Sequence, residues 1–157
     1  MEKYAELFVD VCKSVFKNLG KVDIEAGRPY ISDKDAITEW DISAIIGLAG
    51  ETQGAVVISM KKGLALRVVE QFSGELHTEL NDDVVDVIGE IVNVIAGNAK
   101  QRLENDFALI ISLPTIVRGD SFSLSWNGAH PRIICIPFTI FEGENFILSV
   151  TMNVKEN

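Results

Sequence analysis

The chain has 157 residues, of which 47% are hydrophobic and 24% charged, and its net charge is −9. This length and composition are typical of one globular domain with its own core, which we expect to span residues 1–157. The negative charge and the scattered Lys and Arg residues argue against binding to nucleic acid or to an anionic membrane surface, because both depend on basic contacts to phosphate.

No segment is apolar over the roughly 20 residues that a membrane-spanning helix needs. The longest apolar run, at about residues 107–117, is interrupted by Ser112 and Pro114. The first residues include Glu2 and Glu6 in place of the apolar stretch of a signal peptide. We therefore expect a cytoplasmic protein that does not enter a membrane.

The first elements expected along the chain are a helix and a set of strands. Apolar residues at spacings of three and four predict a helix over residues 4–19, and Gly20 is a suitable stop. Residues 22–60 are typical of strands. Within them, residues 42–48 and 55–60 flank a turn with two glycines, which favours a hairpin.

Two further helices are expected in the middle of the chain. A short one covers residues 63–73 and ends at Gly74. A longer one begins at Asn81 or Asp82, either of which can cap it, and runs to about Asn105. Its buried stripe is predicted to consist of Val84, Ile88, Ile91, Val92, Ile95, Ala99 and Leu103.

The last third of the chain is predicted to form strands. Residues 109–117 contain Pro114, which cannot donate to a strand ladder, so this strand is an edge, or is bulged or interrupted there. Residues 121–126 alternate apolar and polar side chains, and residues 132–141 and 145–154 form a hairpin. The expected fold is α+β, with two long helices packed on one face of a mostly antiparallel β-sheet.

The cysteines and histidines do not suggest a metal or redox site. Cys12 and Cys135 are expected to be free thiols buried as small apolar side chains, since there is no CxxC motif or Cys/His cluster. His77 and His130 lie far apart in polar stretches, where we expect them to be solvated.

The longer helix has a polar arc opposite its buried stripe. At 100° per residue, Asp86, Glu90, Asn93, Gly97 and Lys100 fall within about 80° of one another. The simplest interpretation is an ordinary solvated helix face. However, the two glycines on or beside this arc, at positions 89 and 97, weaken an exposed helix by roughly 1 kcal/mol each, which favours a packing or functional reason.

The residues of this helix resemble a known family. Asp86, Glu90-x-x-Asn93, the following Gly-Asn-Ala at 97–99 and the downstream Pro114 resemble the signature of the CheC/CheX/FliY chemotaxis phosphatases. The closing hairpin is similar too. CheC members carry a motif on each long helix, but residues 8–15 contain no Glu-x-x-Asn, so the chain looks like the CheX branch. CheX-like proteins form homodimers through their sheets, and we expect the same here.

The resemblance implies a phosphatase that hydrolyses the aspartyl phosphate of a CheY-like receiver domain. It gives Asn93 the role of orienting the attacking water and Glu90 the role of pairing with the receiver's active-site lysine. Mg²⁺ is expected in the receiver, so neither a cofactor nor a metal is expected on this chain. Such a reaction leaves this chain the tasks of positioning and electrostatic support.

Other residues of the arc are expected to support the site. Gly89, Gly97 and Lys100 are assigned to the partner-binding surface, together with Asp86, for which simple solvation remains open. Asn98 points away from the arc and is expected, with Pro114, to support the site structurally.

Two other functions remain as alternatives. A non-catalytic protein-binding module, like the middle domain of flagellar switch proteins, would have no reason to keep the Glu/Asn pair on one exposed arc. A small-molecule-binding domain has no support from a glycine-rich phosphate loop or a metal cluster.

Overall fold

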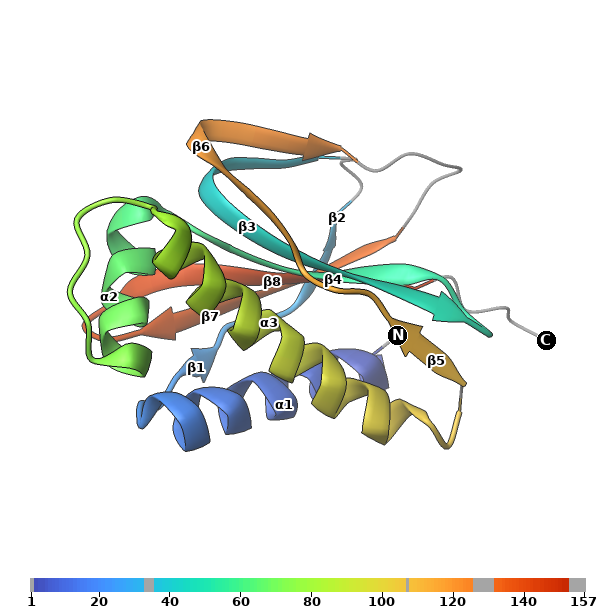
Figure 1. The fold of residues 1–157 in the computed structure, drawn as a ribbon. Helices are drawn as coiled ribbons and strands as arrows, with labels where there is room; N and C mark the ends of the chain where they lie inside the picture. The colour runs from blue at the N-terminus through green and yellow to red at the C-terminus, as the bar shows by residue number, and fades with distance from the viewer. Residues whose placement is uncertain (1, 33–35, 107, 126–131, 153–157) are drawn as a thin grey trace.

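The computed structural model describes residues 2–32, 36–106, 108–125 and 132–152, which form three helices and an eight-stranded antiparallel sheet (Figure 1). The helices are α1 (Glu2–Gly20), α2 (Lys62–Ser73) and α3 (Asp82–Leu103). The strands are β1 (Glu25–Ala26), β2 (Tyr30–Ser32), β3 (Ala36–Gly50), β4 (Gly54–Met60), β5 (Leu109–Ile111), β6 (Thr115–Ser125), β7 (Ile133–Ile140) and β8 (Glu144–Met152).

The strand order in the sheet is β1-β7-β8-β4-β3-β5, with β2 also paired to β7 and β6 also paired to β3. Figure 1 shows the three helices together on one side of the central strands. The α+β fold predicted from the sequence, with the two long helices on one face of an antiparallel sheet, is therefore confirmed. No helix within the described ranges is long and apolar enough to span a membrane.

The core lies between the helices and one face of the sheet. Alternating residues of the central strands contribute side chains such as Ile58 of β4 and Leu148 of β8, and both are fully buried. Phe146 stacks on Phe16 of α1 and on Phe138 of β7, each with ring centroids 5.2 Å apart. The sheet face and the apolar stripes of the helices thus form one continuous core.

Strand β3 is longer than the sequence suggested. It begins at Ala36 rather than near residue 42, because its first half pairs with β6. The register shifts around Trp40, and Glu39 has a positive φ of 71°, so the paired strands bend there. In Figure 1 this bent part of β3 and β6 curves away from the helices. Trp126 and His130, on which sequence predictions were made, lie outside the described residues.

The predicted strand at residues 109–117 is interrupted at Pro114, which was one of the three outcomes expected. Strand β5 ends at Ile111 and β6 begins at Thr115, although both pair with β3. Ser112 bridges the gap: its backbone N–H donates to Gly47 O at 2.9 Å, and its Oγ accepts from Gly47 N at 2.8 Å. The three-residue connection is therefore anchored to the sheet on the side facing β3.

Candidate active site on helix α3

Helix α3 is anchored at its start by a side-chain cap. The Oδ1 of Asn81 accepts a hydrogen bond from the backbone N–H of Val84 at 3.0 Å, which satisfies one of the free amides of the first turn. Asp82 and Asp83 lie in the first turn and Lys100 and Arg102 in the last, which matches the helix dipole. The predicted cap is confirmed, and these features fix the start and register of the helix.

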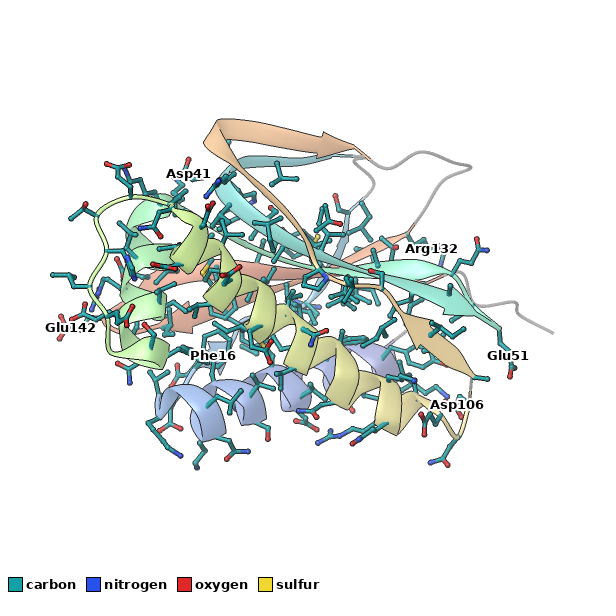
Figure 2. All side chains as sticks on the ribbon, viewed as in Figure 1. Phe16, Asp41, Glu51, Asp106, Arg132 and Glu142 are labelled. Carbon is teal, nitrogen blue, oxygen red and sulfur yellow. The ribbon has the colours of Figure 1, made fainter. Side chains whose placement is uncertain are left out.

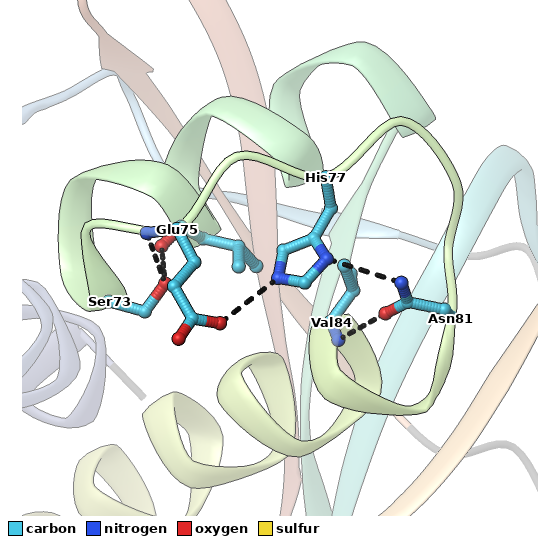
Figure 3. A network of polar contacts seen from close by, with 6 residues as sticks. Ser73, Glu75, His77, Asn81 and Val84 are labelled. Carbon is cyan, nitrogen blue, oxygen red and sulfur yellow. Dashed lines mark hydrogen bonds and ion pairs between the residues drawn. The ribbon is translucent and has the colours of Figure 1, made fainter.

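A network around His77 supports this cap (Figure 3). The Nδ2 of Asn81 lies 3.2 Å from His77 Nδ1, and His77 Nε2 lies 3.6 Å from a carboxylate oxygen of Glu75. Because Oδ1 of Asn81 is used by Val84, its amide nitrogen faces the imidazole as a donor. The His77 side chain is only 13% exposed, so the expectation that it is solvated was wrong. It packs in the turn between α2 and α3.

A second contact, from β6, holds the same end of α3. Arg118 donates to the backbone oxygen of Leu80 at 2.7 Å and to Asp82 Oδ1 at 3.0 Å. Sequence reasoning missed Arg118 because it lies 36 residues from Asp82 and belongs to no motif. Arg118 and Leu80 line a polar pocket of about 280 Å³ beside the start of α3. The pocket contains both signs of charge, from Asp41, Lys62, Glu79 and Arg118.

Most of the surface of α3 is covered by other elements. It packs against α1, α2 and strands β3, β4, β5 and β6, and Figure 1 shows it lying beside α1 and β5. Its buried residues include the seven predicted for the apolar stripe, and in addition Gly89 and Ala96. The side that remains open to solvent includes the arc predicted from the helical spacing, which we call the open arc, and extends beyond it to the exposed residues Asn98, Gln101 and Arg102.

Glu90 and Asn93 lie on this open arc. Glu90 is exposed and Asn93 partly exposed, and a spacing of three residues places them as neighbours on the helix surface. Within the part of the chain that the structure describes, neither side chain has a hydrogen bond or an ion pair. A carboxylate and an amide are thus held side by side on a fixed helix, with their bonding capacity free for a partner.

The two glycines of the motif have different surroundings. Gly89 is buried, and a Cβ built on it would lie 3.3 Å from Ile116 Cδ1 and 3.6 Å from Pro114 Cγ. A Cβ on Gly97 would meet nothing within 4 Å among the described residues. Gly89 was expected on the exposed partner-binding surface, but it is buried and is not exposed there. The missing side chain of Gly89 allows the β5–β6 connection to approach α3. At Gly97, the missing side chain means that nothing projects from this position of the open arc.

Of the remaining residues predicted for the site, three lie on or beside the open arc and one lies away from it. Asp86 is exposed on the open arc, and Lys100 is partly buried on it. Pro114 contacts α3 at Gly89, directly beside Glu90. Asn98 was expected to support the site structurally. It is instead exposed and forms no hydrogen bond among the described residues, so it does not hold the helix against a neighbour.

The structure offers no other obvious chemistry in its described part. Both cysteines are free and buried, as predicted, and burial raises the pKa of each thiol, so both are held in the neutral form. The described residues contain no group of three or more His, Cys, Asp or Glu side chains that could hold a metal ion. The open arc of α3 is therefore the candidate site.

Comparison with known proteins agrees with this fold. A CheX crystal structure from Vibrio vulnificus is 29% identical with a TM-score of 0.84, and the match covers 96% of this chain and 99% of that one. A CheX–CheY–BeF₃–Mg²⁺ complex from Borrelia burgdorferi contains a chain 26% identical with a TM-score of 0.82, covering 96% of this chain and 98% of that one. The fold is thus that of the CheX- and CheC-like proteins.

The sequence comparisons give the family. The curated CheY-P phosphatase CheX from Thermotoga maritima is 28% identical over 133 residues, which are 83% of each chain. The family model described as chemotaxis phosphatase CheX matches residues 42–139, which include α3 and the β5–β6 connection. Because this match covers more than half of the chain, the protein belongs to the chemotaxis phosphatase CheX family, and the resemblance stated from the sequence is confirmed.

Proposed function

We propose that this protein is a phosphatase that hydrolyses the aspartyl phosphate of a CheY-like response regulator in chemotaxis or a related two-component pathway. The observation that carries the proposal is the pairing of Glu90 and Asn93 on the open arc of α3, without partners among the described residues. The names of the Thermotoga and Borrelia relatives support the assignment of the partner.

The proposed reaction needs positioning more than covalent chemistry. A water molecule attacks the phosphorus atom, the bond between phosphorus and the aspartate oxygen breaks, and inorganic phosphate and the free carboxylate are released. Asn93 orients the water in line with that bond, because an amide can both donate and accept and does not titrate. The receiver's own Mg²⁺ supplies charge stabilisation for the phosphoryl oxygens, so this chain needs no metal.

Glu90 serves in docking. Its carboxylate pairs with the active-site lysine of the receiver and sets the position of Asn93 over the phosphorylated aspartate. A charged pair that is covered on binding gives geometric selectivity as well as attraction. Asp86 and Lys100 lie on the same arc and contact the edges of the bound receiver, and Gly97 allows the receiver to approach the helix closely.

The rigidity of α3 is part of the proposed mechanism. The Asn81 cap and the Arg118 contacts hold its start, and the Pro114 contact at Gly89 holds its side. A water held by a mispositioned amide loses its in-line geometry, and displacement by about 1 Å can cost roughly 100-fold in rate.

We also propose that the protein acts in the cytoplasm as a homodimer joined through its sheets.

The test is the rate of phosphate release from a phosphorylated receiver domain. Asn93→Ala should lower the rate by about 100-fold or more, with little change in binding. The matched control is Asn98→Ala, which removes the same amide from an exposed position on the same helix but away from the arc. Equal rates for wild type and Asn93→Ala would refute the role of Asn93.

A second measurement separates the enzyme from a non-catalytic binding module. The receiver is loaded with BeF₃⁻ and Mg²⁺, and its binding to the wild-type chain is measured by calorimetry. Binding without any acceleration of phosphate release would favour the module and contradict the proposed function.

A further inference from the structure

Leu113 is the most exposed large apolar side chain in the described part of the chain. It is 86% exposed, compared with 75% for Leu76 and 70% for Ile110. A single exposed leucine is ordinary on a protein surface. Leu113 differs from such residues by its position, because it lies in the three-residue connection that adjoins the candidate site.

The connection holds Leu113 close to the open arc of α3. The next residue, Pro114, lies against Gly89, which directly precedes Glu90 in the helix. By the helical spacing, Gly89 is on the side of the arc where Asn93 lies, about 40° from it. Leu113 is therefore attached to the segment that borders the catalytic pair on the Asn93 side.

The backbone around Leu113 is also fixed. Ser112 exchanges two hydrogen bonds with Gly47 of β3, and its Oγ donates to the carbonyl oxygen of Leu113 at 2.8 Å. Leu113 thus projects from an anchored segment rather than from a free loop. A side chain presented in this way loses less conformational entropy when a partner covers it.

We propose that Leu113 is an apolar contact for the receiver domain that docks on α3. This inference rests on the proposed function, because the receiver is the partner that the arc is proposed to bind. A stable interface buries about 800 Å² on each partner, which is much more than Glu90 and Asn93 can supply. A receiver centred on this pair must therefore extend onto the neighbouring elements.

The two borders of the arc differ in character. On the α1 side the neighbouring groups are polar, with Asn98 exposed and Arg102 lying 4.0 Å from Asp10 of α1. On the other side the border is formed by Pro114, which is partly exposed, and Leu113. Covering the apolar border removes apolar surface from water, whereas covering the polar border costs desolvation of its polar groups, so the receiver covers the Leu113 side.

The experiment compares Leu113→Ser with Leu76→Ser, a matched control in the turn between α2 and α3 that is almost as exposed. We expect Leu113→Ser to weaken binding of the BeF₃⁻-loaded receiver by about 10-fold. In phosphate-release assays KM should rise by a similar factor while kcat stays unchanged. Leu76→Ser should match the wild type in both assays.

The outcomes separate this inference from the proposed function. If the wild type releases phosphate and Leu113→Ser binds the receiver as tightly as the wild type, only the Leu113 inference is overturned. If Leu113→Ser instead changes the molar mass in light scattering and leaves receiver binding intact, Leu113 belongs to a contact between copies, and the inference is again overturned. A wild type that neither binds nor dephosphorylates the receiver overturns both proposals.

Discussion

At the start of α3, Asn81 and Asp82 hydrogen-bond to neighbouring residues, whereas two turns later Glu90 and Asn93 have no such partner among the described residues. All four are polar side chains of one helix or its cap. The first pair stabilises the fold, because Asn81 hydrogen-bonds to His77 in the turn before α3 and Asp82 accepts a hydrogen bond from Arg118 of β6. The second pair is left available. This contrast is the reason for placing the proposed partner site in the middle of the helix and not at its start.

Of the changes that test this contrast through docking and stability, removal of the Glu90 carboxylate should have the largest effect. Glu90→Ala is expected to raise the receiver concentration needed for half-maximal phosphate release by about 30-fold or more, because loss of one member of a covered charge pair costs about 2 kcal/mol or more. Glu104→Ala, which removes an exposed carboxylate just beyond the end of α3, is the control. An unchanged concentration dependence in Glu90→Ala would show that docking does not use this carboxylate.

The two glycines give the next test, which concerns stability. Gly89→Val should lower the free energy of unfolding by about 2 kcal/mol, because the side chain would be forced against Ile116 and Pro114. Gly97→Val should leave stability nearly unchanged, since that position faces open space among the described residues. Urea unfolding followed by circular dichroism measures both. Similar midpoints for the two variants would contradict the packing described for Gly89.

The smallest expected effect lies at the capped start. Asn81→Ala should lower the free energy of unfolding by about 1 kcal/mol, because the Val84 amide loses its side-chain acceptor. The turnover number should change little, because the Arg118 contacts still hold the start of α3. A 100-fold loss of turnover in this variant, with the protein still folded, would show that the Arg118 contacts alone do not hold Asn93 in position.

The sequence predicted the parts of the site that depend on local spacing. The apolar periodicity of α3 fixes which side chains are buried, and the open arc with Glu90 and Asn93 follows from the same period. Pro114 likewise signals a disturbed strand by its own chemistry. These predictions need no knowledge of distant contacts, so they could be made from the residues alone.

The features that were missed all depend on contacts between distant segments. Gly89 was placed on the open surface because its burial comes from Pro114 and Ile116, which are more than 20 residues away. His77 was taken as solvated because its environment is formed by the folded turn and by Asn81. Spacing along one helix says nothing about which neighbouring element covers it, so such packing has to be seen in three dimensions.

The three-residue connection between β5 and β6 sets where Pro114 lies between the sheet and helix α3. Its two flanking strands are both registered on β3, so their separation leaves no slack for extra residues. Lengthening this gap would shift Pro114 along Gly89 and change the border of the site, whereas lengthening the turn between β7 and β8 would alter neither. We therefore expect the length of this connection to affect the proposed catalysis, although none of its three residues is assigned a role in the chemistry.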